Sequence, residues 1–485
     1  MSKAIEDLKP ALVWKYFAEI SLIPRPSKHE EKIAGYVLGT AKKLGLEAKQ
    51  DRTGNIVVRK PASPGREKVP GIVLQGHLDM VPEKNADKQH DFLKDPIELV
   101  RKGNFMMANG TTLGADNGIA VATNLAIMED RTLEHGPLEF LFTIDEETGL
   151  TGASNLEPGL LKYATLMNLD SEEEGAVYVG CSGGRDSIGT WKANFKAAPG
   201  KHVPLKISVK GLKGGHSGLE IDKGRGNAIK ILNRVILALD NAGARLSGIN
   251  GGNKRNAIPR EADAVVFVPK KKLAAAIKIV ASCNEAMRAE LSTVEPDLAI
   301  TAAEAKGLKK SSVIKPALQE MITRTISALP HGVIKLSADI PGLVETSTNV
   351  AVVSTTKKAI VLATSQRSSV ASEIEEACHA VGSIFLLGGA KVEQTDGYPG
   401  WKPNLESKIL KTAKKTYSEL YGREPHVKAI HAGLECGIIG EKYPGIDMVS
   451  FGPTLEGVHS PDEKIHIDTV DKFWSFLLAI LKNVN

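Results

Sequence analysis

The chain has 485 residues, of which 42% are hydrophobic and 25% charged, as is usual for a globular protein. Lysines and arginines number 62 against 57 aspartates and glutamates, which gives a net charge of +5, and only 5% of the residues are aromatic. So small a charge and so few rings for base stacking argue against a nucleic-acid-binding protein. One hydrophobic core does not suffice at this length, and we expect two or more domains.

The sequence has no sign of export or of a membrane anchor. The stretch MSKAIEDLKPALVWKYF has no continuous apolar run behind a basic start, as a secretory signal would have. No run approaches the ~18 apolar residues that cross a membrane, and FWSFLLAIL is predicted to be a buried helix face. The four cysteines are far apart and form no C-x-x-C pair, which favours a reducing compartment. We therefore expect a cytoplasmic protein that binds no membrane.

The first part of the chain alternates predicted strands and helices. Ser27 and Glu30 have the spacing of a capping box and predict a helix in HEEKIAGYVLGTAKKLG. GNIVVRK and GIVLQGHLDM predict strands, and GADNGIAVATNLAIMED predicts a helix. LEFLFTIDEE and ATLMNLD predict buried strands that end in acidic residues. Buried strands that alternate with helices indicate an α/β domain with a largely parallel central sheet flanked by helices.

The pattern changes over residues 186–394. Strands such as KHVPLKISVKG and NVAVVSTTKKAIVLAT have a half-buried pattern, and helices such as NAIKILNRVILALDN lie between them, which predicts an α+β domain. The α/β pattern resumes with IHAGLECG and MVSFGP. We therefore predict a discontinuous domain of residues 1–185 and 395–485 that is interrupted by an inserted domain. Two stretches of the insert run helix, strand, glycine-containing link and strand, as expected from an internal duplication or from the ordinary repetition of an α+β layer.

Polar residues at the ends of these strands and in loops form a second pattern. They are His77 and Asp79 in VLQGHLDM, Asp116 in TTLGADNGIA, the pair Glu146 and Glu147, Asp170, and His459 in GPTLEGVHSPDE. Each has an ordinary alternative role: a surface histidine, a helix N-cap for Asp116, a solvated acidic turn. Together they are less ordinary, because the carboxyl ends of parallel strands meet at one edge of a sheet, where such folds place their sites.

Two histidines and three carboxylates can hold two divalent cations that share a water. Nitrogen and oxygen donors without a thiolate favour zinc, with cobalt or manganese as substitutes. If the strand continues past His77, Asp79 lies on the same face and can fix the tautomer of the imidazole. The adjacent Glu146 and Glu147 cannot aim at one point in an extended chain, so we expect one to bind metal and the other to face the substrate as a base.

These motifs, together with GLKGGHSG, GGNKRNAIPREA and AIHAGLECG, resemble the dinuclear zinc peptidase family that includes carnosinase, aminoacylase, carboxypeptidase G and bacterial dipeptidases and tripeptidases. The longer strings resemble its aminoacyl-histidine dipeptidase branch, and the resemblance covers the whole chain. It implies a catalytic domain with an inserted lid domain, a small peptide as partner, and a monomer or homodimer. It also implies that two zinc ions activate a water that hydrolyses the peptide bond of unblocked dipeptides, including Xaa-His.

The resemblance also assigns roles to single residues. For the ions and the reaction they are His77 and Asp170 on one ion, Glu147 and His459 on the other, Asp116 as the bridge, Asp79 as the residue that orients His77, and Glu146 as the general base. In the inserted domain, His216 corresponds to a donor to the oxyanion. Asn256 and Arg367 correspond to residues that bind the substrate's C-terminal carboxylate, and Gly433 and Glu435 are expected to line the pocket.

Three other functions stay open on the sequence alone. An N-acyl amino-acid deacylase of the same family would have the same ligands, because the two activities differ in groups that recognise a free amine. The string GCSGG at 180–184 fits the G-x-S-x-G motif of serine hydrolases, which needs a strand before it and a helix after it. AVYVG predicts the strand, but RDSIGTWKANF has no helical apolar stripe. A non-catalytic metal- or peptide-binding protein would not need Glu146.

Overall fold

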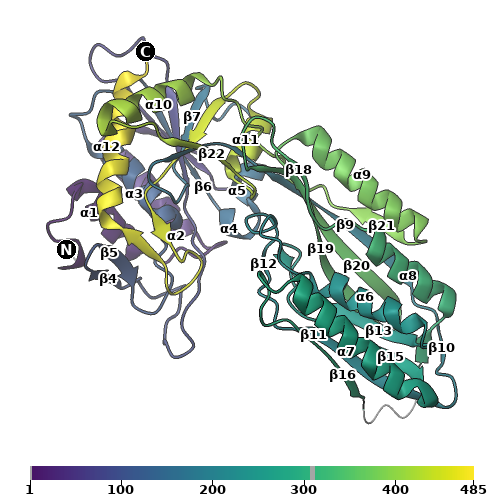
Figure 1. The fold of residues 1–485 in the computed structure, drawn as a ribbon. Helices are drawn as coiled ribbons and strands as arrows, with labels where there is room; N and C mark the ends of the chain where they lie inside the picture. Colours follow the sequence, from purple (N-terminus) through teal and green to yellow (C-terminus); the bar gives the residue numbers. More distant parts are fainter. Residues whose placement is uncertain (1–2, 306–311) are drawn as a thin grey trace. The chain divides into compact units, whose positions relative to one another are not determined.

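The computed structural model describes residues 3–305 and 312–485, which form two compact units (Figure 1). The first unit combines Met1–Cys181, Trp401–Ala429 and Leu434–Asn485, and the second combines Ser182–Gly400 with Ile430–Gly433. The boundaries predicted from the sequence, after residues 185 and 394, lie close to these breaks but leave out the short segment Ile430–Gly433.

The first unit is built on an eight-stranded sheet with the order β1-β2-β6-β3-β7-β23-β8-β22. The inner strands β6, β3, β7 and β23 run parallel, and β1, β2 and β8 are paired antiparallel. The predicted α/β fold with a largely parallel central sheet is therefore confirmed. The strands of this unit, which include a smaller sheet of β24, β25, β5 and β4, are β1 Glu47–Gln50, β2 Ile56–Lys60, β3 Ile72–His77, β4 Leu99–Lys102, β5 Phe105–Ala108, β6 Leu138–Thr143, β7 Thr165–Asn168, β8 Ala176–Cys181, β22 His426–Ile430, β23 Asp447–Ser450, β24 Leu455–Glu456 and β25 Lys464–His466.

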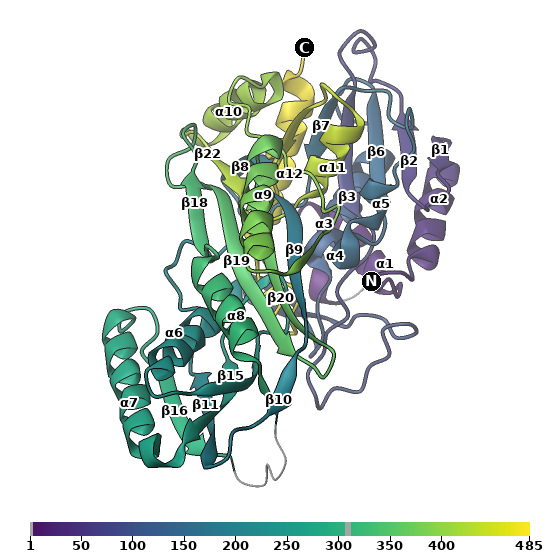
Figure 2. The same cartoon turned by 90° about the vertical axis from the view of Figure 1, so that its right-hand side faces the viewer.

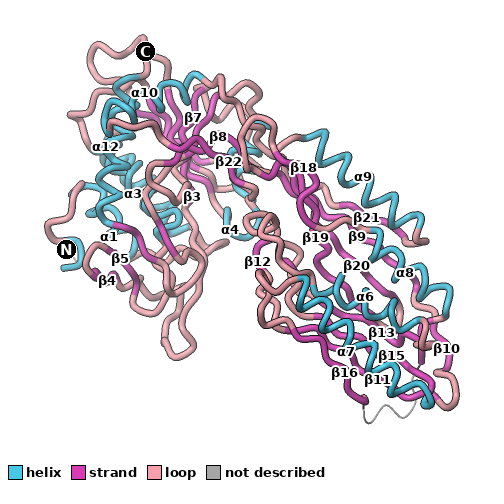
Figure 3. Tube along the Cα trace, in the orientation of Figure 1, coloured by secondary structure: helices cyan, strands magenta, loops and turns pink. Residues whose placement is uncertain are grey.

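Helices flank this sheet, as the cyan segments of Figure 3 show. Helix α3 packs on β3 and α1 packs on α3, while α10 packs on β23 and α12. The close approach of α3 depends on Gly76, because a Cβ there would clash with the Asn117 side chain and lie 2.8 Å from the Cβ of Ala120. The helices of this unit are η1 Lys3–Ile5, α1 Ala11–Ser21, α2 Glu31–Leu44, α3 Ala115–Glu129, α4 Glu146–Gly149, α5 Thr151–Ser154, α10 Lys408–Tyr421, α11 Glu435–Lys442 and α12 Ile467–Asn483.

The predicted helix after Ser27 is present, but its predicted capping box is wrong. Helix α2 begins at Glu31, and no side chain caps its first turn. The hydroxyl of Ser27 donates instead to Asp79 Oδ2 at 2.8 Å. Glu30 accepts hydrogen bonds from the backbone N–H groups of Lys28 and Asp145. Both side chains of the motif are thus used in tertiary contacts, which sequence spacing alone does not reveal.

The second unit is built on a nine-stranded sheet with the order β16-β11-β15-β13-β19-β20-β9-β21, in which β18 also pairs with β19. Helices α6 to α9 pack along this sheet (Figure 2). Their buried hydrophobic side chains, such as Leu232 and Phe385, form part of its core. The elements are β9 Gly183–Lys192, β10 Phe195–Ala197, β11 His202–Lys210, β12 Gly215–His216, α6 Ala228–Asp240, β13 Arg245–Gly251, β14 Ala257–Ile258, β15 Ala262–Pro269, η2 Lys270–Lys272, α7 Leu273–Glu290, β16 Ala299–Glu304, β17 Ser312–Ile314, α8 Pro316–Ala328, β18 Gly332–Leu336, β19 Val344–Thr355, β20 Ala359–Ser368, α9 Ala371–Leu387 and β21 Lys391–Gln394.

The two stretches compared in the sequence have a similar element order in the second unit. Helix α6 is followed by β13 and β15, and helix α8 by β18 and β19, and each pair of strands is antiparallel. The duplication itself stays a prediction. Over the described ranges 3–305 and 312–485, no helix is long and apolar enough to cross a membrane. The apolar string near the C-terminus lies in α12, where Phe473, Phe476 and Leu477 are buried, as predicted.

Candidate metal centre

The predicted ligands meet at the carboxyl end of the parallel strands of the first unit. His77 is the last residue of β3, and Asp170 lies just beyond the end of β7. Glu146 and Glu147 form the first turn of α4, which follows β6. Asp116 lies at the start of α3 with non-helical backbone angles, so its side chain is not directed as in a regular helix. These positions explain how residues far apart in sequence reach one place.

The histidines and carboxylates form two half-sites that share Asp116. Nε2 of His77 lies 3.1 Å from Asp116 Oδ1 and 3.5 Å from Asp170 Oδ1. Nε2 of His459 lies 3.1 Å from Asp116 Oδ2 and 2.9 Å from Glu147 Oε2. Within each half-site the potential ligand atoms all lie within 4.8 Å of one another. Asp116 therefore presents one oxygen to each histidine, as a bridging ligand would.

The charges of this cluster fit divalent cations. In the described part of the chain, no lysine or arginine forms an ion pair with Asp116, Glu147 or Asp170. Burial and the neighbouring carboxylates raise the pKa of Asp170 to about 6, although His77 counteracts this. One oxygen of Glu147, Oε1, is buried and has no hydrogen-bond partner among the described residues. Buried carboxylates with a free oxygen, beside two imidazoles, are a suitable donor set for two cations.

The electrostatics of Asp116 differ from those of the other carboxylates. Burial raises the pKa of Asp116, but hydrogen bonds with His459 and His77 outweigh burial and hold it below its usual range. The pKa of His459 is correspondingly raised to about 11 by Asp116 and Glu147. Both shifts have the same cause, which is the close approach of the imidazoles to the carboxylates.

Asp79 connects both half-sites. Its Oδ1 lies 3.3 Å from Nδ1 of His77, and its carboxylate accepts the backbone N–H groups of Glu146 at 3.0 Å and Glu147 at 3.2 Å. Burial opposes ionisation of Asp79, yet His77 and these N–H donors lower its pKa to about 2. Strand β3 ends at His77, so the contact arises in the bend after the strand rather than from the predicted strand alternation. Asp79 thus holds the turn that carries both glutamates and lies beside the imidazole of His77.

Glu146 lies beside the half-sites. A carboxylate oxygen of Glu146 lies within 4.8 Å of ligand atoms of His77 and Glu147. Burial, together with the charges of Asp170, Glu435 and Glu147, raises its pKa well above the usual value, against the effect of His77. A carboxylate with a raised pKa next to the ligands is suited to proton transfer at neutral pH.

Three further residues next to the centre were not predicted from the sequence. Oδ1 of Asn117 accepts the backbone N–H of His77, and its Nδ2 donates to the carbonyl of Leu169, at 3.2 and 3.0 Å. It therefore ties the ends of β3 and β7 to the start of α3. Arg25 and Glu463 are buried beside Asp116 and bond to the backbone. Asn117 belongs to the quoted string GADNG, but its spacing has no signal that separates it from an ordinary helix residue.

Glu435 was expected to line the pocket, but it lies in the interior of the first unit. Its side chain is fully buried and accepts hydrogen bonds at 2.6 Å from Nε2 of Gln75 and from the hydroxyl of Thr143. Burial raises its pKa to about 7, although His77 and Thr143 counteract this. Its second oxygen is buried without a hydrogen-bond partner. Glu435 is therefore an interior group next to the centre, not part of an open surface.

A further acidic group, formed by Glu30, Asp79 and Asp145, also has the spacing of a metal site. Its oxygens are already occupied by donors of the protein: backbone N–H groups bond to Glu30 and Asp79, and the hydroxyls of Thr148 and Thr151 bond to Asp145. This group is accounted for by its hydrogen bonds and needs no ion.

The other predicted residues lie in the second unit, around a buried arginine. Arg367 is 5% exposed and donates from Nη1 to the hydroxyl of Tyr398 at 2.9 Å and from Nε to Ser217 at 3.3 Å. Its Nη2 lies 3.4 Å from Nε2 of His216. In the described part of the chain no carboxylate pairs with it. Burial and the charge of Arg367 lower the pKa of His216 to about 4, so this imidazole is neutral at pH 7.

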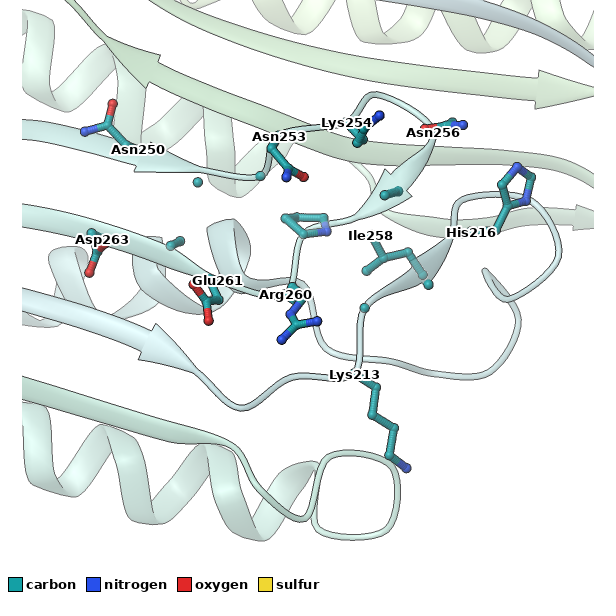
Figure 4. A pocket seen from close by; sticks show the side chains of 17 residues that line it. Lys213, His216, Asn250, Asn253, Lys254, Asn256, Ile258, Arg260, Glu261 and Asp263 are labelled. Atoms are coloured by element: carbon teal, nitrogen blue, oxygen red, sulfur yellow. The ribbon is translucent and has the colours of Figure 1, made fainter. Parts of the chain in front are cut away.

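Asn256 and Gly433 lie in the same unit. Figure 4 shows Asn256 beside His216 at the rim of a hollow of about 910 Å³. A Cβ on Gly433 would lie 2.9 Å from the ring of Tyr398, so this glycine lets Tyr398 pack closely. Neither Ser217 nor Tyr398 was predicted as a site residue from the sequence, although Ser217 follows His216 directly in GGHSG.

The serine-hydrolase motif does not have the required structure. The residues after Ser182 form strand β9 rather than a helix, and the Ser182 side chain is fully buried. The nucleophile of such an enzyme sits exposed on a strand-to-helix turn. The serine-hydrolase alternative is therefore wrong.

Comparison with known proteins agrees with this geometry. The sequence pattern of peptidase family M20/M25/M40 matches residues 73–483. The chain belongs to this family. As an M20 peptidase it is a hydrolase that acts on peptide bonds.

Two relatives of this M20 peptidase match along almost their full length. Cytosol non-specific dipeptidase of Escherichia coli is 42% identical over 481 residues, which are 99% of this chain and 99% of the relative. The structure of aminoacylhistidine dipeptidase from Vibrio alginolyticus is 43% identical with a TM-score of 0.90, over 99% of this chain and 98% of that one. A tripeptidase from Staphylococcus aureus has a TM-score of 0.57 and 18% identity, over 98% of this chain and 99% of that one, which shows a shared fold alone.

Proposed function

We propose that this M20 peptidase is a cytoplasmic dinuclear zinc dipeptidase that cleaves unblocked dipeptides, Xaa-His among them. The observation that carries the proposal is the pair of half-sites that share Asp116, each with one histidine and one further carboxylate. The substrate class is supported by the two relatives that match along the full chain, which are named as dipeptidases, one of them cytosolic. For the assembly we propose a monomer or homodimer.

The distances support the proposed roles of the ligands. His77 and Asp170 would hold one ion, Glu147 and His459 the other, and Asp116 would bridge them. Zinc suits these nitrogen and oxygen donors, and cobalt or manganese are plausible substitutes. When bound, the two ions supply a shared water of pKa near ~7 and polarise the scissile carbonyl.

The chain's own residues would carry the proton and stabilise the charge. Glu146 accepts the proton of the attacking water and returns it to the leaving amine. Asp79 stays ionised and holds His77 together with the turn that carries Glu146. His216, a neutral imidazole, donates an N–H to the oxyanion that develops on the carbonyl oxygen.

We further propose that Arg367 binds the C-terminal carboxylate of the substrate. A buried guanidinium without a carboxylate partner is costly unless a ligand supplies the negative charge. Tyr398 and Ser217 fix the orientation of its fork, and a fixed fork favours bidentate binding of a carboxylate. Asn256 is proposed as a second donor to this end of the substrate. Gly433 would act through Tyr398, and Glu435 from inside the fold through Gln75 and Thr143.

The metal proposal predicts a stoichiometry of two. Protein loaded with excess zinc and desalted should contain about two ions per chain by elemental analysis, and a chelator should abolish activity that added zinc restores. Asp116→Asn should lower the content of both ions, because it weakens the ligand that both share. A wild-type content that stays at one ion under saturation would contradict the dinuclear centre and the bridging role of Asp116.

The carboxylate proposal predicts a limit on substrate length. One extended residue spans ~3.5 Å, so a tripeptide cut at its first bond moves its carboxylate away from Arg367 by that distance. Loss of the charge-assisted bonds costs about 1.5–3 kcal/mol, or about 10–150-fold in kcat/KM. Dipeptides should therefore be cut well, and tripeptides or C-terminally amidated dipeptides poorly.

The control compares the effect of C-terminal amidation of the dipeptide on the wild type and on two arginine variants. Amidation should strongly lower kcat/KM of the wild type and of Arg324→Ala, because Arg324 is an exposed residue of α8 that pairs with Glu320. Amidation should lower kcat/KM of Arg367→Ala much less. If amidation costs all three proteins the same factor, Arg367 does not bind the carboxylate. Faster cleavage of N-acetyl amino acids than of dipeptides would instead indicate a deacylase.

A further inference from the structure

The segment Leu113–Asp116, which ends in the shared ligand, is held by a carboxylate from another part of the chain. Glu463 is 2% exposed. Its Oε2 accepts the N–H groups of Leu113 at 2.7 Å and Gly114 at 2.9 Å. Its Oε1 accepts those of Ala115 at 2.7 Å and Asp116 at 3.3 Å. One carboxylate thus satisfies four successive backbone donors, a stronger restraint than the single bond of an ordinary cap.

A buried cation holds the same segment through its carbonyl groups. Arg25 is 3% exposed and donates from Nη2 to the carbonyl of Gly114. Its Nη1 donates to the carbonyls of Leu78 and Asp79, both at 2.9 Å. Burial lowers the pKa of Arg25, and Glu463 is the carboxylate that counteracts this most. The two side chains have opposite charges, and their hydrogen bonds go to the backbone around the ligands.

Arg25 and Glu463 each connect Asp116 to a different histidine ligand. Glu463 lies in the same loop as His459, four positions further along the chain. Arg25 bonds to the two residues that directly follow His77. None of these bonds uses a side-chain atom of the five proposed ligands.

We propose that Arg25 and Glu463 are positioning residues that hold Asp116 between the two half-sites before any ion binds. This inference rests on the dinuclear centre of the proposed function. A loop that is already ordered loses less conformational entropy when its ligands close around an ion. Glu463 should matter most for the ion held by Glu147 and His459, and Arg25 most for the ion held by His77 and Asp170.

Glu463→Gln tests the proposal directly. Glutamine keeps the shape but offers one acceptor oxygen, and its amide N–H groups would face two of the four donors. The stepwise zinc affinities of the folded variant, measured by competition with a chromophoric chelator, should be weaker by about 10–100-fold, as for other groups that orient ligands. Glu463→Asp, which keeps the charge but cannot span all four donors, should lie between the variant and the wild type. Glu456→Gln is the matched control, because Glu456 is an exposed carboxylate at the end of β24, just before this loop, and pairs with Lys464 and His466.

The outcomes separate this inference from the proposed function. A wild type that does not bind two ions would overturn the dinuclear centre itself. A wild type with two ions, together with unchanged affinities in Glu463→Gln and Glu463→Asp, would overturn the positioning role. A lower free energy of unfolding in the metal-free variant with unchanged affinity would show a purely structural role and would overturn it as well. If Glu463→Gln does not fold, Glu463→Asp and Arg25→Lys provide the same measurement.

A second comparison tests which ion each residue serves. Glu463→Gln should weaken the binding of the remaining ion less in a His459→Ala background than in a His77→Ala background. In the His459→Ala background, Glu463 can act on that ion only through Asp116. Arg25→Lys should weaken the binding of the remaining ion more in the His459→Ala background than in the His77→Ala background, since Arg25 holds the residues after His77. Equal effects in both backgrounds would contradict the assignment of each residue to one ion.

Discussion

Glu146→Gln should lower kcat by about 10²–10⁴-fold while the protein keeps both ions. Glutamine has the shape of glutamate but cannot accept the proton of the attacking water. Burial and the neighbouring charges of Asp170, Glu435 and Glu147 raise the pKa of Glu146 in the metal-free protein, and bound cations counteract those charges. The carboxylate can then accept a proton at neutral pH and release it to the amine.

The adjacent residue is the control for this experiment. Glu147→Gln should lose metal, because Glu147 lies 2.9 Å from His459 and has a buried, unused oxygen. Metal content and kcat are to be measured on the same preparations. If Glu146→Gln loses metal and Glu147→Gln keeps it, the two roles are exchanged.

His216→Ala should lower kcat by about 10²–10³-fold, or ~3 kcal/mol, with little change in KM. A donor to the oxyanion acts mainly in the transition state, so its loss leaves ground-state binding almost intact. His379→Ala, on the exposed side of α9, should change neither value. An unchanged kcat in His216→Ala would leave this histidine without a catalytic role.

The pH dependence gives a second readout for His216. Burial and Arg367 lower its pKa to about 4, so the imidazole stays neutral throughout the range from pH 6 to pH 9. The ratio of kcat between wild type and His216→Ala should therefore be constant over this range. A ratio that changes by tenfold per pH unit would show that the group titrates there and is not a neutral donor.

The sequence was sufficient for the fold class, and the structure brings the residues predicted as ligands close together. Strands β3 and β6 are buried at every residue, which is the pattern that indicated a parallel sheet, and their acidic ends pointed to its carboxyl edge. His77, Glu147 and Asp170 follow strands of this sheet, so their approximate place depends on its topology. Asp116 and His459 lie at a helix start and in a loop, and sheet topology does not place them. The roles of single residues came from the resemblance to the peptidase family.

The residues that support the ligands could not be predicted in this way. Glu463 and Leu113 are hydrogen-bonded across 350 positions of sequence, and no local pattern marks either residue. Ser27 had the spacing of a cap and forms a tertiary bond instead. Glu435 occurs in a string shared with the family, but the string does not say whether the side chain points to solvent or inward. Such contacts depend on how loops pack, whereas strand and helix patterns depend on neighbours in sequence.

The position of β23 in the sheet also determines when this enzyme can mature during its synthesis. Strand β23 lies between β7 and β8 in the middle of the first unit's sheet, yet it follows almost the entire second unit along the chain. A ribosome therefore releases β3, β6 and β7 long before the strand that completes their sheet, and His459 emerges later still. Domains generally fold in order as they leave the ribosome, and contacts that are distant in sequence form slowly. The segment Ser182–Gly400 is also released before β23 and His459. The group of His77, Asp116 and Asp170 is therefore synthesised early, whereas the group that includes His459 is complete only when the last part of the chain has been made.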